Sequence, residues 1–281
     1  LYPQKGAHNR LLAEYGATTL FKQLDLKSVQ RPFTMDSQLG VGIYEWIDGE
    51  QMTQFGSKEI LASLELIRAI NQPVVRPTFK DFGFACDACI SGKDVQSQLM
   101  RRLKQFDSAR EQNDNLDKFF SLRFLPLVEQ VISWTRELMG DQFFVDVKDQ
   151  QLALSPSDFG MHNTLKVSED KIVFHDFEYF GFDDPVKLIC DFVHHASMKL
   201  TSEQEQQWVA GAVDIFGKEV KERIYAFWPL YGLIWCLIIL NEFRDEMWCH
   251  RCLASHHQQD DRESVLKVQL EKASLQLEKV A

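Results

Sequence analysis

The sequence predicts an α+β fold in which short strands occupy two stretches of the chain and helices make up the remainder. Two β-rich runs, residues 28–35 and 41–47, flank a turn-like stretch near the N-terminus. Two more runs, residues 164–167 and 171–174, flank a polar tetrad. Each pair is typical of a β-hairpin. From Ser202 onward apolar residues recur at helical spacing, which predicts an all-helical C-terminal part.

The helices are predicted by apolar residues that recur every three or four positions. In the first, Leu11, Leu12, Tyr15 and Leu20 would bury one face. In a later one, Pro126 stands near the first turn, where its missing N–H costs nothing. In chain order we expect helices over residues 9–24, 57–71, 95–106, 122–139, 186–200, 203–216, 218–243 and 261–280.

Composition limits the function classes that the chain can belong to. With 281 residues, 45% hydrophobic and 26% charged, it is long enough for one or two domains with ample cores. The net charge of −10 argues against a general nucleic-acid binder and against attraction to an anionic membrane. The longest apolar run, residues 227–240, is short for a bilayer span and contains Pro229 and Gly232, so we expect a buried helix.

The six cysteines indicate a reducing cytoplasm with free thiols. We therefore expect a cytoplasmic protein. Cys86 and Cys89, like Cys249 and Cys252, have the spacing of zinc ligands. Nothing in the sequence brings the two pairs together, and small buried cysteines at helical intervals give the same pattern, which is the interpretation we favour.

Residues 152–180 carry the chemistry. If the turn of the second hairpin is centred between Glu169 and Asp170, paired positions sum to 339 and Asn163 lies opposite Asp176. An amide oxygen and a carboxylate are suitable Mg²⁺ ligands, with waters and substrate phosphates completing the octahedron. Asp158, on the loop before the hairpin, could orient a substrate hydroxyl and accept its proton.

The alternative is that these are ordinary turn residues, because Asp and Asn are common turn formers. Either fragment alone would favour that interpretation. The predicted register, which makes the fragments meet, favours a functional site. The spacing D-x4-N, strand, turn, strand, D-F is that of the catalytic half of a kinase.

Residues 157–163, Ser-Asp-Phe-Gly-Met-His-Asn, followed by residues 175–179, His-Asp-Phe-Glu-Tyr, resemble the aminoglycoside phosphotransferase and choline kinase superfamily. The resemblance implies a two-lobed protein-kinase-like fold, with Asp158 as catalytic base and Asn163 and Asp176 as Mg²⁺ ligands. Glu178 would support a second metal or the acceptor.

Some positions depart from the family pattern. Pro156 stands where relatives have a histidine two residues before the catalytic Asp, so the support of the loop must differ. Leu188 replaces a family Asp, and Asp191 is a candidate to take over its supporting contacts. His194 and His195 are interpreted as structural, because adjacent helix residues point about 100° apart and cannot chelate one ion.

The resemblance also divides the chain into a small, truncated nucleotide-binding lobe at residues 1–47 and a mostly helical catalytic lobe at residues 48–281. Glu14 has the position of the helix glutamate that pairs with the nucleotide-binding lysine in kinases; the alternative is a solvent-facing carboxylate. Because the sequence opens at Leu1 without Met, we expect the lysine and the Gly-rich loop upstream of it.

Adenine would bind at the hinge, at backbone groups of Glu45, Trp46 and Ile47; the alternative for this stretch is an edge strand with a buried Trp. The expected reaction is Mg²⁺-dependent transfer of the ATP γ-phosphoryl group to a hydroxyl of a small molecule such as an aminoglycoside, choline, ethanolamine or a sugar. The runner-up is a catalytically silent kinase-like module that binds a nucleotide or a protein partner.

Overall fold

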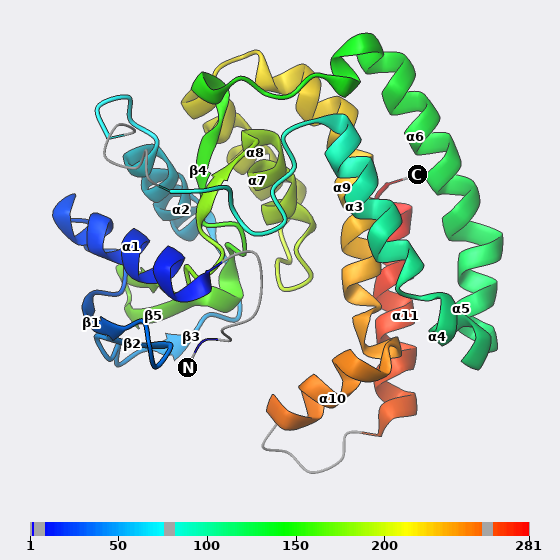
Figure 1. Cartoon of the computed structure of the whole chain (residues 1–281), viewed down its shortest axis with the longest axis horizontal. Coiled ribbons are helices and arrows are strands. Elements are labelled where there is room, and N and C mark those ends of the chain that lie inside the picture. The colour runs from blue at the N-terminus through cyan, green and yellow to red at the C-terminus, as the bar shows by residue number, and fades with distance from the viewer. Residues whose placement is uncertain (1, 3–8, 76–81, 255–260, 281) are drawn as a thin grey trace. The chain divides into compact units, whose positions relative to one another are not determined.

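The structure, a computed structural model, describes residues 2, 9–75, 82–254 and 261–280 (Figure 1). The chain forms two compact units: the first comprises residues 1–88 and 147–221, the second residues 89–146 and 222–281. The predicted boundary at residue 47 separates a nucleotide-binding lobe from a catalytic lobe. It is a division by function, and it stays a prediction.

Unit 1 contains all the strands of the described chain, in small antiparallel sheets, with the orders β1-β2, β3-β5-β6 and β4-β7. Both predicted hairpins are therefore confirmed. The strands are β1 (Pro32–Asp36), β2 (Val41–Tyr44), β3 (Glu50–Gln51), β4 (Ala153–Ser155), β5 (Thr164–Ser168), β6 (Lys171–Phe174) and β7 (Gly181–Asp183).

The predicted register of the β5-β6 hairpin is confirmed next to the turn, where Ser168 pairs with Lys171, and is wrong by one residue beyond it. Thr164 pairs with Phe174 and Lys166 with Ile172, and the pairing shifts between Lys166 and Ser168. This irregularity behaves as a β-bulge, which inserts one extra residue into one strand. Asn163 therefore lies opposite His175, whose N–H donates to the Asn163 carbonyl over 3.1 Å.

The helices of unit 1 begin and end close to the predicted residues, with one exception. Asn9 caps the first helix by accepting the Leu12 N–H over 3.1 Å, and this helix packs against β1 and β2 (Figure 1). The predicted helix over residues 186–200 ends at residue 194, because His195 leaves the helix and its ring accepts the Ser197 N–H. The helices are α1 (Arg10–Gln23), α2 (Ser57–Ile70), α7 (Pro185–His194) and α8 (Ser202–Phe216), with 3-10 turns at Asp149–Gln151 and Met161–Asn163.

An aromatic core holds the loops of unit 1 in place. Phe177 and Phe180 pack edge-on against Phe21 of α1, with ring centroids 5.0 and 5.5 Å apart. Phe159 packs between Phe174 and Phe192, at 5.0 and 5.8 Å. All these rings are buried, and buried aromatic rings contribute more apolar area than other side chains. The packing of Phe159 and Phe177 thereby fixes the backbone positions of their neighbours Asp158 and Asp176.

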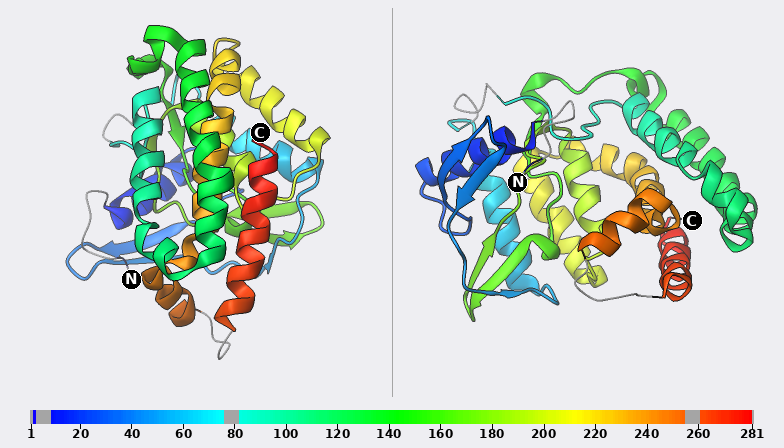
Figure 2. Two further views of the ribbon diagram at one scale, coloured as in Figure 1. Left: turned by 90° about the vertical axis from the view of Figure 1, so that its right-hand side faces the viewer. Right: turned by 60° about the horizontal axis from the view of Figure 1, so that its bottom comes forward.

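Unit 2 is helical, and its longer helices run alongside one another (Figure 2). The Thr135 hydroxyl joins α6 to α9 by donating to the Ala226 carbonyl, and the Cys236 thiol joins α9 to α11 by donating to the Ala273 carbonyl. The helices are α3 (Gly92–Lys104), α4 (Asp107–Gln112), α5 (Asp114–Phe119), a π-helical turn at Phe120–Phe124, α6 (Leu125–Met139), a 3-10 turn at Gly140–Phe144, α9 (Val220–Ile239, which starts at the end of unit 1), a 3-10 turn at Asn241–Phe243, α10 (Asp245–Ala254) and α11 (Arg262–Glu278).

The apolar stretch Val220–Phe243, which contains α9, is long and apolar enough to cross a membrane by length and composition alone. However, 78% of its apolar window is buried inside the protein, as in the core helix of a soluble protein. The predicted buried helix is therefore confirmed.

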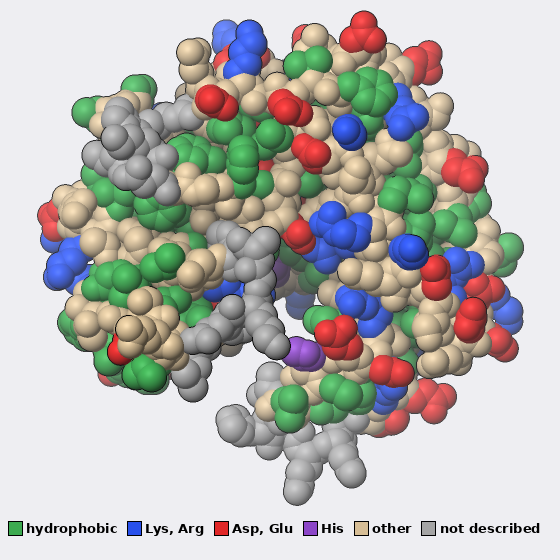
Figure 3. Space-filling view, in the orientation of Figure 1, with side chains coloured by type: hydrophobic (Ala, Val, Ile, Leu, Met, Phe, Trp, Pro, Cys, Tyr) green, Lys and Arg blue, Asp and Glu red, His purple; other side chains and the backbone are tan. Residues whose placement is uncertain are grey.

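The six cysteines are all free, as predicted. Cys249 and Cys252 are exposed on α10, whereas Cys89 is buried and faces the Gln98 side chain at 3.6 Å. Within the described part of the chain, the cysteines belong to no group of potential metal ligands. On the face shown in Figure 3, basic side chains lie among acidic ones.

Candidate active site

Asp158 lies on a sharp turn that follows β4. Ser157 has a positive φ of 67°, and its N–H donates to the Ser155 hydroxyl over 3.0 Å. A non-glycine residue in this conformation is uncommon and is found most often where the surrounding structure imposes it. Here the buried ring of Phe159 anchors the next position. The turn therefore presents the Asp158 side chain, which is 37% exposed, away from the core.

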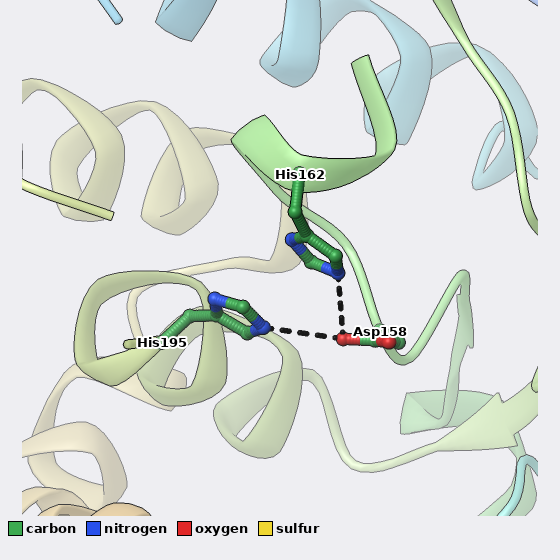
Figure 4. A group of neighbouring side chains, drawn as sticks. All are labelled: Asp158, His162 and His195. Carbon is green, nitrogen blue, oxygen red and sulfur yellow. Dashed lines mark hydrogen bonds and ion pairs between the residues drawn. The ribbon is translucent and has the colours of Figure 1, made fainter. Parts of the chain in front are cut away.

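Two imidazole rings point at one oxygen of Asp158 (Figure 4). His162 Nε2 lies 3.1 Å from Asp158 Oδ1, and His195 Nε2 lies 3.3 Å from the same oxygen. Burial alone would raise the pKa of Asp158, but chiefly the hydrogen bonds from the two histidines outweigh it and hold the pKa well below its ordinary value. Asp158 is therefore ionised at neutral pH.

The Asn163 side chain is buried and faces Asp158. Its Nδ2 donates to the Asp158 backbone carbonyl over 3.0 Å. Because a carbonyl can only accept, this bond fixes which end of the amide is the NH₂ group. No residue of the described chain donates to Asn163 Oδ1, so this oxygen is available to a ligand.

Asp176 follows β6 and also has a positive φ, 63°. Burial raises its pKa, and the charges of Glu178 and Asp158 raise it further. The predicted direct pairing of Asn163 with Asp176 is wrong, as the register shows. The two residues nevertheless converge on Asp158, one through a hydrogen bond and the other through electrostatic repulsion.

Glu14 is buried on α1, with 6% of its surface exposed, so the alternative of a solvent-facing helix carboxylate is wrong. The Tyr2 hydroxyl donates to its carboxylate, and so does the Phe177 N–H. Burial raises the pKa of Glu14 to about 7; the hydrogen bond from Tyr2 opposes this rise, and the charges of Asp176 and Glu178 add to it. Glu14 therefore belongs to the same electrostatic cluster as Asp176.

Glu178 forms an ion pair with Arg10 of α1, with 2.9 Å between Oε1 and Nη1. The Arg10 guanidinium also lies over the Tyr179 ring, 4.7 Å from its centroid. A cation in this position has attractive interactions with both the carboxylate and the ring face. Arg10 thus ties α1 to the segment that carries Asp176.

The predicted hinge residues follow β2. The Glu45 N–H donates to the Arg31 carbonyl over 2.8 Å, and the Glu45 carbonyl accepts from the Gln30 side chain over 2.8 Å. Trp46 is 88% exposed, so the alternative of a buried Trp in an edge strand is wrong. Of the three residues, Trp46 and Ile47 have no backbone hydrogen bond to any other described residue.

The residues present fit a hard divalent cation. Mg²⁺ prefers carboxylate and amide oxygens, and Asn163 Oδ1 and Asp176 supply one of each. Burial raises the pKa values of Asp176 and Glu14, and the charges of neighbouring carboxylates raise them further. A bound cation would relieve that repulsion.

Sequence reasoning missed the partners of the site. The separation of Asp158 and His162 by four residues is a usable signal, because both lie on the one short loop between β4 and β5. His195, Tyr2 and Arg10 come from elsewhere in the chain and carry no local signal. Asp191 was expected to support the loop; its carboxylate pairs with Lys187 at 2.7 Å, and its charge acts on His195.

No family model and no curated protein matches this sequence. Solved structures do match its fold. One is a choline/ethanolamine kinase family protein from Mesorhizobium loti, with 15% identity over 97% of this chain and 80% of the other and a TM-score of 0.55.

Two further structures show the same fold. A spectinomycin phosphotransferase bound to AMP has 13% identity over 96% of this chain and 85% of the other, with a TM-score of 0.61. The choline kinase of Streptococcus pneumoniae has 15% identity over 98% of this chain and 84% of the other, with a TM-score of 0.54.

Proposed function

We propose that this chain, which has the fold of the choline/ethanolamine kinases and aminoglycoside phosphotransferases, is a small-molecule kinase that transfers the γ-phosphoryl group of ATP to a hydroxyl. The observation that carries this proposal is the convergence of Asn163 and Asp176 on Asp158. One solved relative is a spectinomycin phosphotransferase in complex with ADP and spectinomycin, which supports nucleotide and alcohol as the ligand classes.

Asp158 would accept a hydrogen bond from the acceptor hydroxyl. Its low pKa makes it a weak base, so its main role would be to orient the hydroxyl rather than to deprotonate it early. This suits phosphoryl transfer, whose transition state is largely dissociative and requires positioning more than strong nucleophilic activation. The proton would pass to Asp158 late in the transfer.

Asn163 Oδ1 and the Asp176 carboxylate would hold Mg²⁺. When bound, the ion would supply positive charge that neutralises the charge developing on the transferring phosphoryl group. The role of this chain's residues is to hold those oxygens ready. The Nδ2 hydrogen bond of Asn163 turns its Oδ1 outward, and the buried Phe177 fixes the position of Asp176. Glu178 would contribute indirectly, through Arg10.

The nucleotide would lie between residues 1–47 and the catalytic loop, in the two-lobed arrangement of a protein kinase. Adenine would bind the backbone of Trp46 and Ile47, because the polar backbone groups of Glu45 are already hydrogen-bonded within the chain. Glu14, which is close enough to Asp176 to be affected by its charge, would pair with the nucleotide-binding lysine that the resemblance implies. The free thiols suit a reducing compartment, and we place the enzyme in the cytoplasm.

The test is Mg²⁺-dependent ATP consumption by the full-length protein across a panel of small alcohols, amino alcohols, aminoglycosides and sugars. Asp158→Ala serves as the control. Acceptor-dependent turnover that the variant loses would establish the kinase and its substrate class. Nucleotide binding without turnover on any acceptor would instead favour a silent kinase-like module.

A further inference from the structure

We propose that His162 and His195 form a two-imidazole clamp that positions the Asp158 carboxylate, with both rings donating an Nε2–H to Oδ1 and leaving Oδ2 for the acceptor hydroxyl. The catalytic meaning of this clamp rests on the proposed function. Its protonation pattern does not, and the two can be tested apart.

The geometry singles out one oxygen. Both Nε2 atoms lie near Oδ1, at 3.1 and 3.3 Å, and among the described residues none donates to Oδ2. The two rings stack in parallel, with centroids 4.2 Å apart and an interplanar angle of 6°. A carboxylate held through one oxygen cannot rotate freely, so its other oxygen is presented in a fixed direction (Figure 4).

The rings reach Asp158 from separate elements. His162 lies on the 3-10 turn Met161–Asn163, and His195 is the residue that ends α7. Pro156, two residues before Asp158, has no side-chain donor. The catalytic loop is therefore supported from its C-terminal side and from a distant helix end.

The tautomer of His195 follows from its other nitrogen. The Ser197 backbone N–H, which can only donate, lies 3.0 Å from His195 Nδ1. Nδ1 must therefore be the unprotonated nitrogen of a neutral ring, and the proton is on Nε2, facing Asp158. Burial lowers the pKa of His195, which supports the neutral form.

His162 meets the same carboxylate oxygen, which can only accept, so its Nε2 also carries a proton. Its Nδ1 lies 3.2 Å from the Ser197 hydroxyl, and that hydroxyl lies 2.7 Å from His195 Nδ1. Ser197 thus links the two rings on the side away from Asp158.

A metal ion competes with the clamp as an explanation for this cluster. The ligand atoms of Asp158, His162 and His195 all lie within 4.8 Å of one another, which is the spacing of a divalent-metal site. A metal would need the lone pair of each Nε2, with the proton moved to Nδ1. The Ser197 N–H blocks that arrangement at His195, because Nδ1 already accepts it and cannot carry the displaced proton.

The protonation pattern is tested by NMR on the full-length protein labelled with ¹⁵N-histidine. The clamp predicts that His195 carries its proton on Nε2, with the resonance assigned by its loss in His195→Gln. A proton on Nδ1 would overturn the proposal. So would stoichiometric Zn²⁺ binding in calorimetry that His195→Met abolishes.

The positioning role is tested by matched variants. His195→Gln keeps an N–H near the position of Nε2, whereas His195→Met has similar length and no donor. We expect His195→Met to lower kcat about 10- to 100-fold with the KM for ATP within about twofold, and His195→Gln to recover most of the loss. His250→Gln, at an exposed position on α10, is the control substitution.

Equal activity in His195→Gln and His195→Met would overturn the clamp while leaving the kinase intact. A wild-type protein that turns over no acceptor would instead count against the proposed function, and the NMR result would still decide the protonation pattern.

Discussion

The side-chain amide of Asn163 donates to the backbone carbonyl of Asp158 over 3.0 Å, and so fixes the catalytic loop and the direction of its own oxygen together. The buried amide is thereby satisfied on its nitrogen side and presents Oδ1 to a ligand. A single residue links loop geometry to metal binding, and substitutions can separate the two roles.

Asn163→Asp should keep an oxygen ligand but lose the donor, and its carboxylate would face the Asp158 carbonyl. We expect the free energy of unfolding to fall by about 1–3 kcal/mol, because a buried acceptor is left unpaired. Asn163→Ala should lose Mg²⁺-dependent nucleotide binding as well. Urea denaturation and calorimetry with and without Mg²⁺ measure both effects. Equal Mg²⁺ dependence in the two variants would contradict the ligand role of Oδ1.

Truncation of Asp158 and truncation of Asp176 should affect turnover and nucleotide binding differently. Asp158→Ala should lower kcat by about 10²- to 10⁴-fold with little change in nucleotide affinity, because it removes only the group that receives the acceptor. Asp176→Ala should weaken binding of the Mg²⁺-nucleotide complex itself. Steady-state kinetics and nucleotide titrations distinguish these outcomes. The role assignment would be wrong if both variants lost turnover and affinity in equal measure.

Phe177 anchors Asp176, and its removal should destabilise unit 1. The ring is 1% exposed and packs 5.0 Å from that of Phe21. We expect Phe177→Ala to lower the free energy of unfolding by about 3–5 kcal/mol, the usual cost of truncating a buried aromatic residue. Phe33→Ala is the matched control, because Phe33 is 65% exposed on β1. Urea denaturation that shifts equally for both variants would contradict the packing role.

The raised pKa of Glu14 predicts how stability depends on pH. Its pKa is about 7 in the folded protein against the ordinary glutamate value of 4.5, so the folded state binds the proton more tightly. Its contribution to stability is therefore full below about pH 4.5 and is lost as the pH rises through about 7, by up to about 3 kcal/mol.

Glu14→Gln should remove this dependence. Without Mg²⁺ or nucleotide, the variant should gain stability relative to the wild type between pH 5 and pH 8. The exposed Glu65→Gln on α2 provides the control. Free energies of unfolding measured at pH 5 and at pH 8 check the prediction. If the free energy of unfolding changed with pH equally in the wild type and in Glu14→Gln, Glu14 would not titrate in this range.

Local signals predicted much of the fold. Apolar spacing predicted helices from residues 9 and 261, and the structure begins each one residue later, because Asn9 and Asp261 are N-caps whose side chains accept free N–H groups. The helix end at His194 was missed, because no Gly or Pro marks it and a side-chain contact of His195 terminates it. The pairing of the hairpin beyond its turn was predicted wrongly, because nothing in the sequence of the polar turn indicates the irregularity between Lys166 and Ser168.

Of the candidate site, the sequence predicted the residues whose spacing is fixed along the chain and missed those that meet only in the fold. Asp158, Asn163 and Asp176 lie within one loop and hairpin. His195 reaches the same place from the end of α7, and Tyr2 reaches Glu14 from outside α1. The alternative of a buried Trp46 was wrong for another reason: tryptophans are mostly buried, and this one is exposed.

Phosphoryl transfer to an acceptor is tested most directly by ³¹P NMR of a reaction containing the full-length protein, Mg²⁺, ATP and the acceptor panel, with Asp158→Ala in parallel. The proposed reaction should form ADP and a phosphate monoester in equal amounts with the wild type, and the variant should form neither. Nucleotide binding without ADP formation, or ADP accompanied only by free phosphate, would contradict it.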